Sequence, residues 1–291
     1  MLAGILLPQV GKIFQPYPLY LMMFLLFMSF LSIRLNSIYD ILKTHMGSIL
    51  WISFLKLLLL PLIVYMLFKV FYPRYALAAM LLSGISTGVV APFISTLVRA
   101  NGPFVLVMVV VSSLLVPFTL PAMVKLLLGR SIEISFQSMM QLLCVVIFVP
   151  AAAAEGCRRL RPEILDLVLK ARYPLSLMAF ALINLGIFAR HAAFFRQDPL
   201  AIVESLVVAS LLGALFFVMG MAALWKSSLE NQLASAISLA NINNVVIIVF
   251  ASEFFGPLEP TLAAMYMIPF FGLILPMRIY GRLRASPQAA G

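Results

Sequence analysis

Nine separate stretches of this chain are each long and apolar enough to cross a lipid bilayer, which takes about 20 mainly apolar residues. They lie at 17–33, 46–71, 75–99, 103–128, 136–156, 173–189, 199–225, 230–255 and 259–281. The loops between them are short, and only 10% of the 291 residues are charged while 64% are hydrophobic. A soluble domain does not have this composition. The sequence therefore predicts one compact, all-α membrane protein with nine transmembrane helices.

Residues 1–13 are apolar but too short to cross. We expect a short N-terminal stub there, and whether it is the remainder of a tenth helix stays open. A cleaved signal peptide is not expected, because Met1 to Gln9 lack a positive region and a small-residue cleavage site. The two cysteines, Cys144 and Cys157, fall in a span and at the head of an arginine-rich loop, so no disulfide is expected.

The basic residues predict an orientation, since the side of a membrane protein that is richer in Lys and Arg faces the cytoplasm. Seven lie on the side of the N-terminus: Lys12, Lys69, Arg74, Lys125, Arg130, Arg190 and Arg196. Twelve lie on the opposite side: Arg34, Lys43, Arg99, Arg158, Arg159, Arg161, Lys170, Arg172, Lys226, Arg278, Arg282 and Arg284. We predict insertion in the inner (cell) membrane with the N-terminus outside, the C-terminus in the cytoplasm, and the loop 157–172 as the strongest cytoplasmic marker.

A polar run interrupts the eighth predicted span at 238–244. Hydrocarbon offers no water to amide groups, so its asparagines must face a helix, a cavity or a passing solute. A regular helix would place Asn231, Ser235, Ser238, Asn241 and Asn244 on one face. These residues could simply join helices by hydrogen bonds. Three asparagines within four residues, at 241, 243 and 244, instead favour an unwound turn and a transport site.

The third predicted span is also interrupted, by a run of small residues and Pro92. We expect Pro92 to free a backbone carbonyl near Gly88, and we take Ser86, Thr87 and Pro92 as candidate binding residues. A proline kink with ordinary small-residue packing is the other interpretation. A shift of 152 residues pairs 85–86 with 237–238 and 117–118 with 269–270. This shift corresponds to five predicted spans. Because that number is odd, the second copy would be inverted in the membrane, which is typical of the inverted repeats of secondary transporters.

Lys56 lies near the centre of the second predicted span, about 15 Å from either end at 1.5 Å per residue. Its stem is too short to carry the ammonium from there to the headgroups. The group must pair with a carboxylate, sit among carbonyls or lose its proton, and in the last case it could carry protons.

The remaining polar residues point to no other chemistry. Glu155, Glu204 and Glu253 fall near span ends and are expected at the interface. His45 and His191 lie in loops without metal-ligand spacing. We therefore expect no metal, no cofactor and no enzyme activity. The net charge of +10 comes mostly from loops, so nucleic acid is not an expected partner.

Two motifs resemble the bile acid:sodium symporter family, part of a larger group with arsenite permeases and auxin efflux carriers. The stretch 112–121, Ser-Ser-Leu-Leu-Val-Pro-Phe-Thr-Leu-Pro, is similar to the family's Ser-Thr-Leu-Leu-x-Pro-x-x-x-Pro. The pair Asn243-Asn244, followed by apolar residues, is similar to its Gln-Asn pair. The likeness runs over most of the chain and is densest at 46–128 and 230–281.

The resemblance implies ten helices in two inverted repeats, here about 1–130 and 131–284, with members of nine helices also known. It implies a panel domain formed by 1–33 and 136–189. It also implies a core domain formed by 46–128 and 199–284, in which two broken helices cross.

The departures from the family bear on the coupling ion. The family's sodium-ligating Ser-Asn falls on Ala91-Pro92, its glutamate on Leu239, and a sodium-site glutamine on Lys56, with Pro61 fixing the register. Sodium sites need clustered oxygen donors, preferably with a carboxylate. The sequence thus predicts a transporter or facilitator of a small organic anion that works by alternating access. Lys56 would stand in for the coupling cation, and a proton or no ion would replace sodium.

Three other functions stay open at this point. The first is sodium-coupled transport like that of the bile acid symporters. The second is a membrane sensor or receptor that does not transport, which a soluble output domain would favour. The third is an intramembrane enzyme acting on lipid. The candidate binding residues are Lys56, Ser86, Thr87, Pro92, Ser238, Asn241, Asn243 and Asn244.

Overall fold

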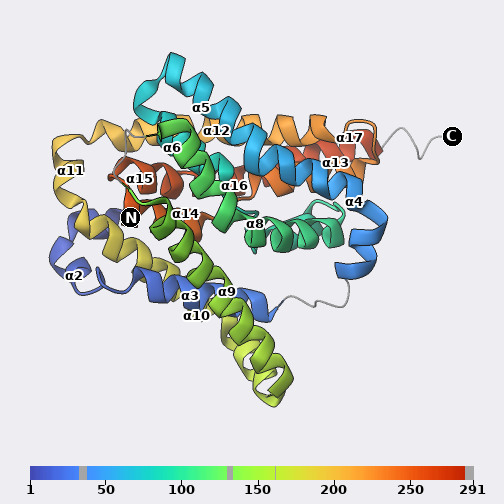
Figure 1. Cartoon of the computed structure of the whole chain (residues 1–291), viewed down its shortest axis with the longest axis horizontal. Helices are drawn as coiled ribbons and strands as arrows, with labels where there is room; N and C mark the ends of the chain where they lie inside the picture. The colour runs from blue at the N-terminus through green and yellow to red at the C-terminus, as the bar shows by residue number, and fades with distance from the viewer. Residues whose placement is uncertain (33–37, 130–133, 161, 286–291) are drawn as a thin grey trace.

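The computed structural model describes residues 1–32, 38–129, 134–160 and 162–285, and it gives the backbone alone for 38–40, 162–170 and 282–285. Its described part is helical throughout, with one isolated β-bridge and no β-strand. Figure 1 shows a bundle whose helices run mostly along the long axis. The prediction of an all-α membrane protein is confirmed.

Six helical stretches in the described residues have the length and composition to cross a membrane. They are Ile41–Phe71, Gly102–Leu128, Phe136–Leu160, Ala171–Arg190, Leu200–Ala223 and Leu258–Gly281. Two further apolar helices, Pro18–Leu31 and Asn244–Phe254, are shorter. The predicted number of nine spans is therefore not confirmed. The number of long apolar helices is lower than predicted because the first predicted span is a 14-residue helix and two others are each divided into a pair of short helices.

The predicted third and eighth spans are the divided ones. The third consists of α6 (Ala76–Gly84) and α7 (Ala91–Leu97), and the eighth of α13 (Leu229–Ala240) and α14 (Asn244–Phe254). The remaining elements are α1 (Leu2–Leu6), α2 (Pro8–Lys12), α3 (Pro18–Leu31), α4 (Ile38–Phe54), η2 (Leu55–Leu59), α5 (Leu60–Phe71), η3 (Pro73–Tyr75), α8 (Gly102–Leu128), α9 (Phe136–Leu160), α10 (Pro162–Arg190), α11 (Ala192–Gln197), α12 (Leu200–Ala223), α15 (Leu258–Met265), α16 (Met267–Gly272) and α17 (Ile274–Ala285).

The stretch 157–172 was expected to be a loop, and that expectation is wrong for its described residues. Helix α9 continues to Leu160 and α10 begins at Pro162. The two form a long helical hairpin that extends away from the rest of the bundle at the bottom of Figure 1. Proline suits the first turn of a helix, where its missing N–H has no partner to lose, and Pro162 is the first residue of α10.

The helices pack in two groups. In one, which we call the α3 group, α3 packs against both α9 and α10, and α1 and α2 lie on α10. Close approach there depends on glycine. A Cβ on Gly4 would lie 2.7 Å from Leu185 O, and one on Gly186 would lie 2.6 Å from Phe14 O. Residues 1–13 therefore form two short helices held against α10, which agrees with the expected stub.

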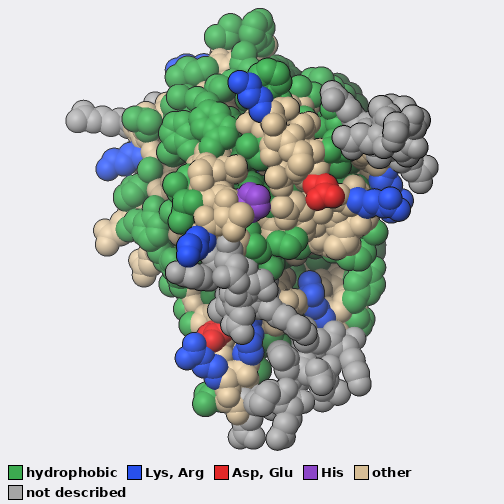
Figure 2. Space-filling model, turned by 90° about the vertical axis from the view of Figure 1, so that its right-hand side faces the viewer, with side chains coloured by type: hydrophobic (Ala, Val, Ile, Leu, Met, Phe, Trp, Pro, Cys, Tyr) green, Lys and Arg blue, Asp and Glu red, His purple; other side chains and the backbone are tan. Residues whose placement is uncertain are grey.

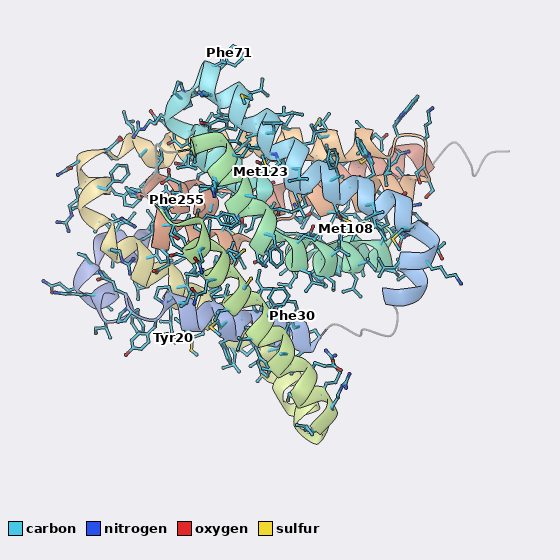
Figure 3. The ribbon with its side chains drawn as sticks, in the orientation of Figure 1. Tyr20, Phe30, Phe71, Met108, Met123 and Phe255 are labelled. Carbon is cyan, nitrogen blue, oxygen red and sulfur yellow. The ribbon has the colours of Figure 1, made fainter. Side chains whose placement is uncertain are left out.

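The other group, which we call the α13 group, holds α4 to α8 and α12 to α17. Its two divided helices are surrounded by the others, and α13 packs mainly against α12 and α8. Along α8, Met108 is buried in the middle of the bundle, whereas Phe71 at the end of α5 is 80% exposed and points outward (Figure 3). This is the distribution expected when lipid covers the outer surface.

The N-terminus and α17 lie toward opposite ends of the long axis in Figure 1, with the N-terminus to the left and α17 to the right. Figure 2 looks onto the right-hand end, where Lys and Arg side chains are frequent and acidic ones are few. Six of the nineteen basic residues used for the orientation, Arg34, Arg130, Arg161, Lys170, Arg282 and Arg284, lie outside the described side chains. The orientation stays a prediction.

Candidate functional site at the two helix interruptions

The first interruption lies at Ile85–Val90, between α6 and α7. Helix α6 ends there because the backbone of Ile85 is extended, with φ −77° and ψ 158°, and cannot continue the helical hydrogen bonding. Thr87 N then donates to Ser112 Oγ of α8 at 2.9 Å. Ser86 and Thr87 are fully buried, so the unwound turn is held within the bundle.

Pro92 does not act as expected. It stands in the first turn of α7, where proline costs a helix no hydrogen bond. The nearby carbonyl is not free either, because Gly88 O accepts a hydrogen bond from Ala91 N at 2.9 Å. Pro92 lies in the first turn of the second half-helix, and the prediction of a free carbonyl near Gly88 is wrong.

The second interruption is shorter and covers residues 241–243. Helix α13 ends at Ala240, and Asn243 caps α14, its side chain accepting from Val246 N at 3.4 Å. The unwound turn predicted from the asparagines is therefore present. The single polar face predicted from Asn231 to Asn244 is wrong beyond α13, because the helix does not continue.

The two interruptions meet. Thr87 and Ile242 form an isolated antiparallel bridge. Gly88 N donates to Asn241 O at 2.7 Å, and Asn243 N donates to Ser86 O at 2.9 Å. A Cβ on Gly88 would lie 2.5 Å from Ile242 O, so glycine is required for this approach. Backbone groups that lost their helical partners are satisfied across the contact.

The shift of 152 residues does not align these interruptions. It pairs Ile85 with Ile237, yet Ile85 follows the last residue of α6 whereas Ile237 lies inside α13.

The carbonyls at the end of α13 receive donors from three other elements. Thr87 Oγ1 donates to Ser238 O at 2.8 Å, and Tyr266 OH donates to Ala240 O at 2.8 Å. Lys56 Nζ donates to Leu239 O, between them, at 3.2 Å. The last carbonyls of a helix carry its negative dipole end. This cluster of donors therefore satisfies the last carbonyls of a helix end that is buried in the middle of the protein.

Lys56 is fully buried. It belongs to a π-helical turn, η2, in the otherwise α-helical stretch from α4 to α5. Such turns insert one residue and are frequent at functional sites. Within the described residues the ion pairs link Arg74 with Asp198 and Glu204, Glu155 with Arg158 and Arg159, and Arg190 with Glu253. None involves Lys56, whose Nζ faces a helix end instead of a carboxylate.

The acidic residues expected at the interface make those surface ion pairs. In the turn before α6, Arg74 donates a hydrogen bond to the Asp198 carboxylate, and this contact raises the pKa of the Arg74 guanidinium above its usual value. Because both partners are about one-third exposed, this contact is a surface feature with little bearing on the buried site.

Several oxygens near the interruptions have no partner among the described residues. They are Ser86 Oγ, Ser235 Oγ, Asn241 Oδ1 and Asn244 Oδ1. The asparagine amides are otherwise anchored, since Asn241 Nδ2 donates to Phe270 O at 3.1 Å and Asn244 Nδ2 contacts Met267 Sδ at 2.8 Å. Buried polar atoms without partners are uncommon in proteins, and they are found where water or a ligand binds.

A cavity of about 490 Å³ lies close to the second interruption. Met267, the partner of Asn244, lines it from the α13 group. Phe180, Asn184 and Leu185 of α10 line the opposite wall, and Met1 and Ala3 complete it. The cavity therefore lies between the two helix groups. Its wall is mostly apolar.

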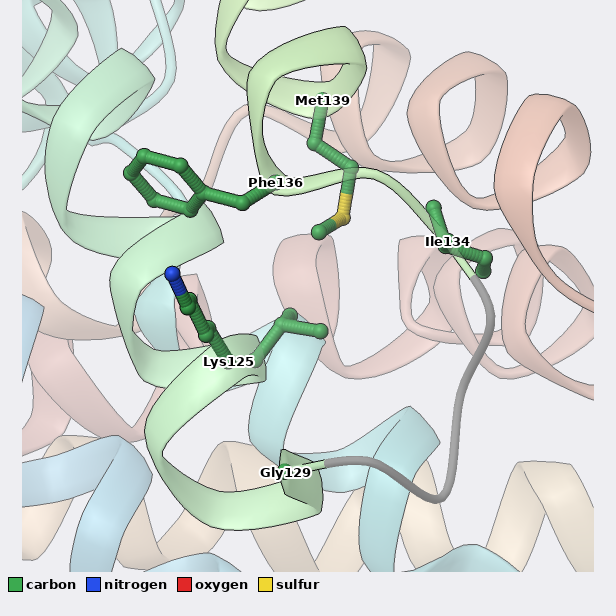
Figure 4. Close-up of a pocket in the computed structure, with 6 residues that line it drawn as sticks. Lys125, Gly129, Ile134, Phe136 and Met139 are labelled. Carbon is green, nitrogen blue, oxygen red and sulfur yellow. The ribbon is translucent and has the colours of Figure 1, made fainter.

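A smaller cavity of about 170 Å³ lies elsewhere, between the end of α8 and the start of α9. There the Lys125 ammonium stands 5.2 Å from the centre of the Phe136 ring, with Ile134 and Met139 beside it (Figure 4). It contains none of the candidate residues and is not part of the site.

The structure thus brings Lys56, Ser86, Thr87, Ser238, Asn241, Asn243 and Asn244 to the two interruptions. Sequence reasoning missed Tyr266, Ser112 and Met267. Ser112 lies in a recognised motif, and Tyr266 lies in the last predicted span, but neither position has a spacing that relates it to the interruptions. No group of three possible metal-ligating side chains occurs among the described residues.

Two interrupted helices that meet inside an apolar bundle are typical of the binding region of a secondary transporter. The sequence comparison identifies the family. The profile of the sodium bile acid symporter family matches residues 19–198, which is more than half of the chain, so the chain belongs to this family of membrane transporters. The match includes Lys56 and the first interruption and ends before the second. No curated protein matches the chain.

Proposed function

We propose that this protein is a secondary transporter or facilitator of a small organic anion, that it works by alternating access, and that it is not driven by sodium. The observation that carries the proposal is the contact of Lys56 Nζ with Leu239 O at 3.2 Å. In other secondary transporters, the C-terminal ends of half-helices help to coordinate the coupling cation. Here a covalently attached cation occupies such an end.

The residues present fit a sodium ion poorly. A sodium site needs several clustered oxygens and benefits from a carboxylate. The oxygens of Ser86, Asn241 and Asn244 are free of partners. However, the carboxylates in the described ion pairs are engaged elsewhere, and an ammonium beside the same helix end would repel Na⁺. We therefore do not assign sodium coupling, and a proton or no ion takes its place.

The charge of the site favours an anionic solute. A lysine ammonium has three N–H donors, and Leu239 O is the one acceptor found for Lys56 among the described residues. Carboxylate oxygens would satisfy the remaining donors with charge-assisted hydrogen bonds. The unpartnered oxygens at the interruptions could accept hydrogen bonds from hydroxyl groups of the same solute. A small organic acid meets both needs.

The two helix groups support a division into panel and core. The α3 group corresponds to a panel of 1–33 and 136–189, and the α13 group to a core of 46–128 and 199–284. The cavity of about 490 Å³ between them would bring the solute close to Asn244, because Met267, which lines the cavity, contacts Asn244 Nδ2. Movement of one group against the other would then expose the site to each side in turn, as in transporters built from inverted repeats.

A thermal-shift screen of the purified protein tests the solute class. Small carboxylates are added to wild type, to Lys56→Met and to Lys69→Met, which alters an exposed lysine at the end of α5. A bound carboxylate at 100 times its Kd should stabilise wild type by about 2.7 kcal/mol. It should also stabilise Lys69→Met but not Lys56→Met. A carboxylate that stabilises all three proteins equally would contradict a role for Lys56 in binding.

A further inference from the structure

Arg190 connects the two helix groups. It is the last residue of α10. Its Nη1 lies 3.9 Å from Glu253 Oε1 and donates to Ser252 O at 3.5 Å, and both partners belong to the end of α14. The guanidinium therefore spans from the α3 group to the second interrupted helix.

The partners of Arg190 form a favourable place for a cation. Ser252 and Glu253 lie in the last turn of α14, which ends at Phe254. Carbonyls of a last turn carry the negative end of the helix dipole, and Glu253 adds a full negative charge. The same arginine thus interacts with a helix end and with a carboxylate.

Arg190 is also held by its own group. Its Nη2 donates to Gln15 O at 3.3 Å. The preceding residue, Phe14, is pressed onto α10, because a Cβ on Gly186 would lie 2.6 Å from Phe14 O. The guanidinium is therefore kept in position on the α3 group when the other group moves away.

We propose that Arg190 and the end of α14 form a latch that holds the two helix groups together at the end of the molecule near α2 and α11. The inference rests on the proposed alternating access. Both side chains are more than one-third exposed, at 39% and 34%, and an ion pair of this kind is weak. Weak contacts suit a latch, since it must break and form again in each transport cycle.

Spin-label distances test the latch in the full-length protein in lipid nanodiscs, with no solute present. Cysteines replace Ile13 of the α3 group and Leu200 of the α13 group, both 66% exposed, after Cys144 and Cys157 are changed to serine. Arg190→Gln and Glu253→Gln should raise the population with the longer distance by up to about fivefold. Arg196→Gln, an exposed arginine of the same end that forms no ion pair with another described residue, is the matched control.

The conservative change Arg190→Lys, which keeps a positive charge beside Glu253 and the end of α14, should retain the wild-type distances, whereas a variant with a damaged fold would not. The latch is overturned if Arg190→Gln and Glu253→Gln give the same distances as wild type and Arg196→Gln. The series is repeated with Lys56→Met. If Lys56 has no part in transport, the latch variants still change the distances, so the two proposals fail separately.

Discussion

The two interruptions differ in what they contribute. The first, Ile85–Val90, supplies two donors, since Thr87 Oγ1 and Gly88 N donate to the other segment, and one acceptor, Ser86 O, which accepts from Asn243 N. The second follows the end of α13, whose carbonyls also accept from Lys56 and Tyr266. Lys56 donates to Leu239 O near the end of α13, and among the described residues no hydrogen bond joins it to the first interruption. The comparison shows that breaking a helix is not sufficient to create a charged site. The orientation of the broken ends decides which of them binds a cation.

The largest effect on stability should come from the contact point itself. Gly88→Ala should lower the free energy of unfolding by about 2 kcal/mol, because the added Cβ would meet backbone atoms that have little freedom to move. Equilibrium unfolding in mixed micelles measures it. Gly47→Ala, whose Cβ would meet nothing within 4 Å, is the control. Equal stability of the two variants would mean that the interruptions need not touch.

Lys56→Met should raise the free energy of unfolding instead of lowering it. Methionine removes a fully buried charge that has no ion-pair partner among the described residues, and replacing such charges with apolar side chains is often stabilising. We expect the free energy of unfolding to rise by about 1.5 kcal/mol in the same assay, while Lys69→Met stays near wild type. A strong loss of stability would make Lys56 a structural cap of α13 and nothing more.

Tyr266→Phe should have a smaller effect. The change removes the hydrogen bond to Ala240 O, but that carbonyl also accepts from Ile242 N at 3.1 Å. We expect a loss of about 1 kcal/mol, as for one buried hydrogen bond. Tyr20→Phe, at an exposed position, should change nothing. If both variants behave alike, the phenol does not stabilise the end of α13.

Ser86→Ala should have the smallest effect on stability, within about 0.5 kcal/mol of wild type, because its hydroxyl has no partner to lose. Thr87→Val is the matched variant, and it should cost more, since Thr87 Oγ1 donates to Ser238 O. Comparing the two separates hydroxyls that hold the interruptions together from those left free for a solute. A reversed order would contradict that division.

Hydropathy and polar residues were enough to predict much of the fold. An apolar chain in lipid must form helices, and the asparagines at 241, 243 and 244 indicated where one of them unwinds. The position of Lys56 predicted a buried charge. The number of spans was predicted less well. Counting apolar stretches assumes unbroken helices of about 20 residues, whereas α3 has only 14.

The details of the site depended on contacts between distant residues. Pro92 was expected to free a carbonyl near Gly88, and that prediction was wrong because the extended backbone at Ile85 ends α6 and places Pro92 in the first turn of α7. The family resemblance assigned both Leu239 and Lys56 to sodium-site positions. It did not predict that the Lys56 amine would meet the backbone oxygen of Leu239, 183 positions away. Tyr266 likewise has no local signal, since its hydroxyl acts through a contact with Ala240 O, at the end of α13 and 26 positions away.

Uptake into proteoliposomes tests the central claim most directly. A carboxylate identified by the thermal-shift screen is offered to wild type and to Lys56→Ala under an inward sodium gradient and, separately, under an inward proton gradient. Uptake by wild type should be the same with a sodium or a potassium gradient, and Lys56→Ala should abolish it. Uptake that requires Na⁺ and persists in Lys56→Ala would contradict the account.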